Sequence, residues 1–169
     1  MERLNAAMAP APVRPVKVLQ FGEGNFLRAF VDYMIDIANE KSDFNGSVAL
    51  VKPIQMGTLF PAFKEQDYRY TVMLRGLVDG QAVEQTRVVT SVSDAVDYAK
   101  LPSLRFIVSN TTEAGIVLDE TDEFSLCPPK SYPGKLTKFL FERAEAFDYA
   151  QDKGLIILPV ELIDDNGIM

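Results

Sequence analysis

The sequence contains no histidine, and this absence removes the most common general base of enzymes. It also excludes a serine-histidine-acid relay and most zinc sites, so no metal centre is expected. The single cysteine, Cys127, has no second thiol for an internal disulfide, and the composition therefore fits a reducing cytoplasm. With no histidine to activate it, Cys127 is interpreted as a loop residue. Acid–base chemistry in this chain must use lysine, acidic residues or tyrosine.

Excess positive charge and long apolar runs are also missing. The chain has 17 basic and 24 acidic residues and a formal charge of −7, so we expect no nucleic-acid partner. No apolar run is long enough to cross a bilayer, and we expect no membrane contact. Residues 1–15 contain three prolines and no apolar signal block, which predicts a loose leader. Residues 16–169 suffice for one domain with a single core.

A short apolar strand, expected over residues 16–21, runs directly into a glycine pair. Gly22 allows a sharp turn, and Gly24 lets backbone amides approach an anion with no Cβ in the way. A helix expected from Asn25 to about residue 40 points its unpaired N–H groups at the same place. The pattern predicts a dinucleotide pyrophosphate site. Leu27 stands where the usual motif has a third glycine, and a lone glycine pair also serves ordinary tight turns.

Strands and helices alternate along the rest of the chain. Apolar runs at residues 48–51, 104–109 and 155–160 are typical of strands buried in a parallel sheet, and a helix is expected over residues 135–149. Two β-rich segments, residues 70–78 and 81–91, meet at an Asp-Gly pair that favours a hairpin. The predicted fold class is α/β, a Rossmann-like, doubly wound, mostly parallel sheet with an inserted β-hairpin.

Both expected helices carry apolar residues at three- and four-residue steps. In the first helix we expect this stripe to face the core, and it comprises Phe26, Phe30, Tyr33, Met34 and Ile37. In the second helix the corresponding side comprises Leu136, Phe139, Leu140, Arg143 and Phe147.

Polar clusters follow three of the expected strands. They lie at residues 22–28, 109–113 and 161–166. Ligands of doubly wound sheets bind beyond the carboxyl ends of the strands, so this convergence favours a binding site. Taken singly, the second cluster is also explained as a helix cap and the third as a surface turn.

Four segments together resemble the mannitol dehydrogenase family of polyol-specific long-chain dehydrogenases, in particular the N-terminal domain of its uronate branch. They are residues 20–30 (QFGEGNFLRAF), 109–116 (SNTTEAGI), 133–137 (PGKLT) and 159–167 (PVELIDDNG). The resemblance runs over nearly the whole chain from Val16 onward. It implies NAD-dependent interconversion of D-tagaturonate and D-altronate in hexuronate catabolism, with this domain holding the cofactor.

The resemblance also implies roles for individual residues. Cofactor contacts are expected from Phe21, Gly22, Gly24, Asn25, Phe26 and Arg28 near the pyrophosphate, and from Asn110, Thr111, Thr112 and Glu113 on the nicotinamide side. Glu161 and Asn166 are expected to face the sugar-acid substrate. Family members continue into a C-terminal helical domain that carries the catalytic lysine, and no lysine of this sequence matches that motif. We therefore expect no catalytic residue in this chain, which alone would bind the cofactor without turnover.

Three alternatives remain open from the sequence. The second strand ends at Lys52 rather than at an acidic residue, and a base there could accept the 2′-phosphate of NADP instead of the ribose of NAD. A related polyol such as mannitol, or mannonate, is an alternative substrate. The same glycine turn also serves nucleotide-binding modules that carry out no redox chemistry.

Overall fold

Five parallel strands form the centre of the computed structural model, which describes residues 3–51, 59–93, 97–111, 113–117, 119–164 and 166. The strands are β1 (Val16–Phe21), β2 (Ser47–Val51), β5 (Val92–Ser93), β6 (Phe106–Ser109) and β7 (Ile156–Pro159). Their order is β5-β2-β1-β6-β7, and every neighbouring pair is parallel. Along the chain, β2 and β5 are added on one side of β1, and β6 and β7 are then added on its other side. This is the doubly wound Rossmann arrangement, and the predicted fold class is confirmed.

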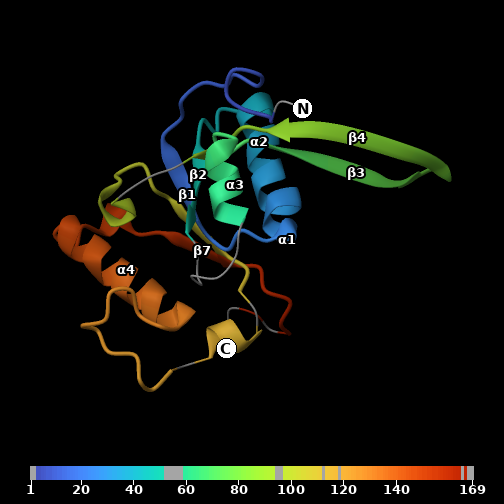
Figure 1. Cartoon of the computed structure of the whole chain (residues 1–169). Helices are drawn as coiled ribbons and strands as arrows, with labels where there is room; N and C mark the ends of the chain where they lie inside the picture. Colours follow the sequence, from blue (N-terminus) through green and yellow to red (C-terminus); the bar gives the residue numbers. More distant parts are fainter. Residues whose placement is uncertain are drawn as a thin grey trace.

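Successive residues of β1 point to opposite faces of the sheet, and each face is covered. Val18 belongs to one apolar cluster together with Leu27 and residues of the hairpin β3 (Tyr70–Val78) and β4 (Gln81–Val89), whereas Leu19 belongs to a second cluster with Ile107. The helical segments α1 (Asn25–Leu27), η1 (Arg28–Asp32), α2 (Tyr33–Lys41) and α3 (Leu59–Glu65) lie on the first face. Helix α4 (Tyr132–Ala146) covers the second, as Figure 1 shows. Burial on both faces explains why β1 and β2 are rich in apolar residues.

The helical stretch after β1 differs from the expected one. It is helical from Asn25 to Lys41, but η1 is a π-helical turn between the two α segments. The predicted core stripe is wrong for Phe26, Phe30 and Met34, whose side chains are 51%, 41% and 52% exposed. The inward face instead carries Leu27 and two buried acids. Those acids are hydrogen-bonded to residues of the hairpin, and the local spacing of apolar residues carries no information about such distant partners.

The hairpin β3 (Tyr70–Val78) and β4 (Gln81–Val89) pairs in register through nine residues and turns at Asp79 and Gly80, both with positive φ. Its base is buried and its far end extends away from the sheet as a two-stranded arm (Figure 1). Arg87 of β4 fastens the base to α2, since its Nε donates to Asp36 Oδ2 at 2.6 Å. The predicted hairpin is confirmed, although the second segment ends at Val89 and β5 begins a new strand.

The C-terminal half contains the expected helix, with shifted bounds, and a strand that is more exposed than expected. Helix α4 runs from Tyr132 to Ala146 rather than over the expected residues 135–149, because Ser131 is its N-cap, with its Oγ accepting from Gly134 N. Leu136, Phe139 and Leu140 of the predicted side pack on the second cluster. Strand β7 was expected to be buried on both faces, but Ile156, Ile157 and Leu158 are 48%, 39% and 43% exposed. Among the described residues β7 is an edge strand with β6 as its neighbour. Within the same residues, no helix combines the length and apolarity needed to cross a bilayer.

Candidate functional site

The glycine turn lies where the strand order reverses, between β1 and β6. Gly22 has φ of +126°, a conformation that strongly favours glycine, and its N–H donates to Val51 O at 3.2 Å. A Cβ at this position would lie 3.0 Å from Leu27 Cδ1 and 3.2 Å from Asn110 O. Leu27, the residue that replaces the third glycine, therefore fills the space under the turn. The sharp turn predicted at Gly22 is present.

Gly24 is different, because its backbone is ordinary and the space beside it is open. Its φ is −67°, and a Cβ there would meet no atom within 4 Å. Gly24 is also the N-cap of the helical stretch, and no side chain caps the helix there. The first N–H groups of a helix have no acceptor within the helix, and they carry the positive end of its dipole. Asn25 and Phe26 are exposed at this end. An anion can therefore reach the amides with no Cβ in the way.

Arg28 binds the turn itself rather than standing free beside it. Its Nε donates to Glu23 O at 3.1 Å, and its Nη2 donates to Asn25 Oδ1. The guanidinium carbon lies 5.4 Å from the ring centre of Phe63 and 5.8 Å from that of Tyr70. These contacts hold the positive charge of Arg28 beside the helix N-terminus.

A second polar cluster joins the ends of β6 and β7. Asn110 Nδ2 donates to Val160 O at 2.7 Å, and Thr111 N donates to Glu161 Oε1 at 3.2 Å. Asn166 Nδ2 donates to Glu161 O at 3.0 Å and to Glu161 Oε2 at 3.2 Å. The backbone N–H of Asn110 also donates to Phe21 O at 3.2 Å, which links this cluster to the glycine turn. The three strand ends thus lie side by side, as the topology requires.

Not every predicted site residue takes part through its side chain. Phe21 is buried, with its ring edge-on to Tyr132 at 5.2 Å, so only its backbone borders the turn. Lys52 and Thr112 lie outside the described residues. Glu113 begins the short helix η3 (Glu113–Ile116), and its side chain is not described.

Sequence reasoning missed a buried polar group beneath the turn, formed by Gln20, Asp32 and Tyr70. Tyr70 Oη donates to Asp32 Oδ2 at 2.7 Å and lies 3.2 Å from Arg28 O. Gln20 Nε2 donates to Gly22 O at 3.1 Å. Gln20 and Asp32 are both fully buried. Two sequence features could have indicated this group. Gln20 is a polar residue inside an apolar strand, and Asp32 is an acidic residue one helical turn after Arg28.

Burial dominates the ionisation of this group. It raises the pKa of Asp32 to about 7, against the lowering effects of hydrogen bonds from Tyr70 and Gln20 and of the Arg28 charge. Burial, followed by the negative charge of Asp32, also raises the pKa of Tyr70, so that its hydroxyl keeps its proton. Near the second cluster, burial raises the pKa of Tyr132. The site thus combines an open helix N-terminus with a buried carboxyl and a buried phenol whose pKa values burial raises.

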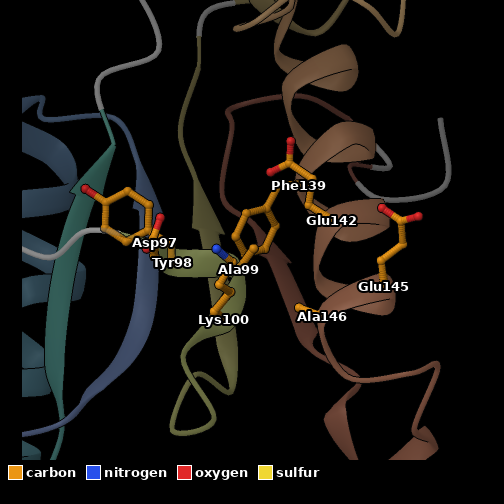
Figure 2. Close-up of a pocket in the computed structure, with 8 residues that line it drawn as sticks. All are labelled: Asp97, Tyr98, Ala99, Lys100, Phe139, Glu142, Glu145 and Ala146. Atoms are coloured by element: carbon orange, nitrogen blue, oxygen red, sulfur yellow. The ribbon is translucent and has the colours of Figure 1, made fainter.

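A surface hollow of about 580 Å³ lies elsewhere, between helix α4 and the segment leading into η2 (Tyr98–Lys100). Figure 2 shows Phe139, Glu142 and Glu145 of α4 on one side, with Tyr98 and Lys100 on the other. None of the predicted site residues lines it. Its acidic side chains also make it a poor place for a diphosphate.

Comparison with known proteins gives a consistent result. The family description "Mannitol dehydrogenase Rossmann domain" matches residues 16–169. The altronate oxidoreductase of Yersinia enterocolitica is 47% identical over 179 residues, covering 99% of this chain and 37% of the relative. That of Bacillus subtilis is 49% identical over 163 residues, covering 90% of this chain and 34% of the relative. The chain therefore spans little more than a third of the length of these curated relatives.

Two solved structures share the fold. Pseudomonas fluorescens mannitol 2-dehydrogenase, in a ternary complex with NAD and D-mannitol, has a TM-score of 0.76 at 21% identity. A substrate-free D-sorbitol dehydrogenase has a TM-score of 0.69 at 18% identity. Each comparison covers 99% of this chain and 40% of the other. At these identities the likeness concerns the fold.

Proposed function

The chain belongs to the mannitol dehydrogenase family, and from this premise we propose that it is the cofactor-binding part of an NAD-dependent oxidoreductase. The proposed reaction interconverts D-tagaturonate and D-altronate by hydride transfer, in hexuronate catabolism. Relatives named altronate oxidoreductase, at 47% and 49% identity, support this substrate pair. A polyol is the second candidate substrate, supported by the likeness to a mannitol 2-dehydrogenase at 21% identity.

One observation supports the cofactor site above all others. Gly22 turns the chain at the point where the strand order reverses, and Gly24 leaves an open approach to an uncapped helix N-terminus. Such an end favours a diphosphate, because unpaired amides and the helix dipole act together. We assign the diphosphate to the backbone amides of Gly24, Asn25 and Phe26. Arg28 orders the turn and adds a positive charge.

The remaining predicted residues fit the other half of the nucleotide. Asn110 and Thr111 lie at the end of β6, next to β1, and would border the nicotinamide. Glu161 and Asn166, which hydrogen-bond to each other, would lie toward the substrate. When bound, the nicotinamide supplies or accepts the hydride. This chain's own residues bind and orient the nucleotide.

We also propose the domain boundaries of the chain. Residues 16–169 would form the cofactor domain, preceded by the segment 1–15. The proton-transferring lysine would come from a following helical domain. The relatives are long enough to contain one, because the chain covers 37% of the first of them. The chain by itself is expected to bind NADH without oxidising altronate.

A fluorescence titration of NADH with residues 1–169 tests this proposal. Gly24→Val places a branched side chain in the open space and should weaken binding at least tenfold. Gly76→Val is the matched control, because a Cβ at Gly76 on the hairpin arm also meets no atom within 4 Å. It should bind as the unaltered chain does. Equal affinity in all three proteins would contradict the proposed site, and a parallel titration with NADPH decides between the two cofactors.

A further inference from the structure

We propose that Tyr70, at the base of the β3–β4 arm, is a positioning residue that holds the cofactor turn through both Arg28 and Asp32. The inference rests on the proposed function, since it concerns the turn assigned to the diphosphate. It gives the inserted hairpin a role in nucleotide binding. Tyr70 lies 42 residues from Arg28 in the sequence, and its hydroxyl lies 3.2 Å from the Arg28 carbonyl oxygen.

The first route runs through the face of the tyrosine ring. Phe63 and Tyr70 lie at 5.6 Å with their rings at 72°, and the guanidinium of Arg28 lies within 5.8 Å of both ring centres. Both aromatic side chains are buried, so they limit the positions that Arg28 can adopt. In turn, Arg28 donates to Glu23 O and Asn25 Oδ1, on both sides of Gly24. The ring of Tyr70 thus limits the position of Arg28, which in turn holds residues 23–25 of the turn.

The second route runs through the tyrosine hydroxyl. Tyr70 Oη donates to Asp32 Oδ2 at 2.7 Å, and hydrogen bonding by the Gln20 amide lowers the pKa of the same carboxyl. Gln20 Nε2 donates to Gly22 O at 3.1 Å. Asp32 closes the π-helical turn η1, and π turns inside helices are frequent at functional sites. The hydroxyl of Tyr70 thus holds Asp32, which is fully buried beneath the turn, while Gln20, also fully buried, holds the Gly22 carbonyl.

The charge on Asp32 should make NADH affinity depend on pH, and a purely structural role would not produce this dependence. The groups acting on it are Arg28 on its own helical stretch, Tyr70 from β3 and the Gln20 amide from β1. Asp36, one turn further on, is paired with Arg87 of β4. With a pKa of about 7, Asp32 gains its charge in the range where binding is measured. A diphosphate bound at the turn would be repelled by that charge, so affinity should fall as the pH rises through 7.

The test uses Tyr70→Phe, which keeps the ring and removes the hydroxyl. We expect roughly tenfold weaker NADH binding, the scale of one lost hydrogen bond to a charged or buried partner. Tyr149→Phe is the matched control, because Tyr149 is 65% exposed beyond the end of α4. It should leave affinity unchanged. Thermal melts of the three proteins show whether each is folded at the titration temperature.

Asp32→Asn is the second variant, and it keeps an acceptor for Tyr70. Affinity of the unaltered chain should fall between pH 6 and pH 8, whereas the variant should show a flat profile. Unchanged affinity in Tyr70→Phe, or parallel pH profiles for Asp32→Asn and the unaltered chain, would overturn the positioning role alone. Absence of NADH binding by the unaltered chain would overturn the proposed function, and this inference with it.

Discussion

Replacing Asp32 with asparagine should make the folded chain more stable at neutral and alkaline pH. The carboxyl is fully buried, and its Oδ1 has no hydrogen-bond partner within 3.5 Å among the described residues. Burial raises its pKa from 3.8 to about 7. Asparagine retains an acceptor for the Tyr70 hydroxyl, which lies 2.7 Å from Oδ2, and it carries no charge.

The direction of the effect follows from where the proton is bound. Below about pH 4 the carboxyl is protonated in both the folded and the unfolded chain, and its burial adds no ionisation cost. As the pH rises from 4 to 7, the unfolded chain loses this proton first, so folding stability declines. Displacement from 3.8 to about 7 corresponds to roughly 4 kcal/mol, at about 1.4 kcal/mol for each pH unit. Above pH 7 the loss is complete.

Urea unfolding followed by far-UV circular dichroism measures the effect, because the chain has no tryptophan to report on unfolding. The stability advantage of Asp32→Asn should grow by about 2 kcal/mol between pH 5.5 and pH 8. Asp152→Asn is a suitable control, since Asp152 is exposed and lies outside the core. A constant difference across this range, or a variant less stable than the unaltered chain at pH 8, would refute the burial argument.

Three further substitutions probe the turn and the packing of helix α4. Gly22→Ala should destabilise the chain by roughly 2 kcal/mol and abolish NADH binding, because the new Cβ meets Leu27 and Asn110 at positive φ. Gly24→Ala, where a Cβ meets no atom within 4 Å, should leave the melting temperature unchanged. Arg143→Met should cost about 3 kcal/mol in urea unfolding, since buried Arg143 donates to four carbonyls. They belong to Ala99, Leu101, Leu104 and Lys153. Equal unfolding midpoints for Arg143→Met and the unaltered chain would contradict this anchoring.

Local sequence patterns predicted the parts of the fold that depend on local rules. Apolar runs identified β1 and β2 because both faces of these strands are buried, and the Asp79-Gly80 pair identified the hairpin because its turn needs positive φ. The convergence of Gly22, Asn110 and Glu161 followed from topology, because parallel strands end at one edge.

The errors arose where partners lie far away in the sequence. Apolar periodicity assigned Phe26 and Met34 to the core, whereas the inward positions hold Asp32 and Asp36. Those acids are compatible with burial only because Tyr70 and Arg87 reach them from the hairpin, 38 and 51 residues away. The burial expected for β7 failed for a related reason. An apolar run shows that a strand suits a buried position, and it carries no information about which segment covers it.

A crystal structure of the chain with NADH tests the central claim most directly. We expect the diphosphate within hydrogen-bonding distance of the backbone amides of Gly24, Asn25 and Phe26, with Arg28 still bound to Glu23 O. A nucleotide bound in the hollow between η2 and α4, with the glycine turn left empty, would contradict it.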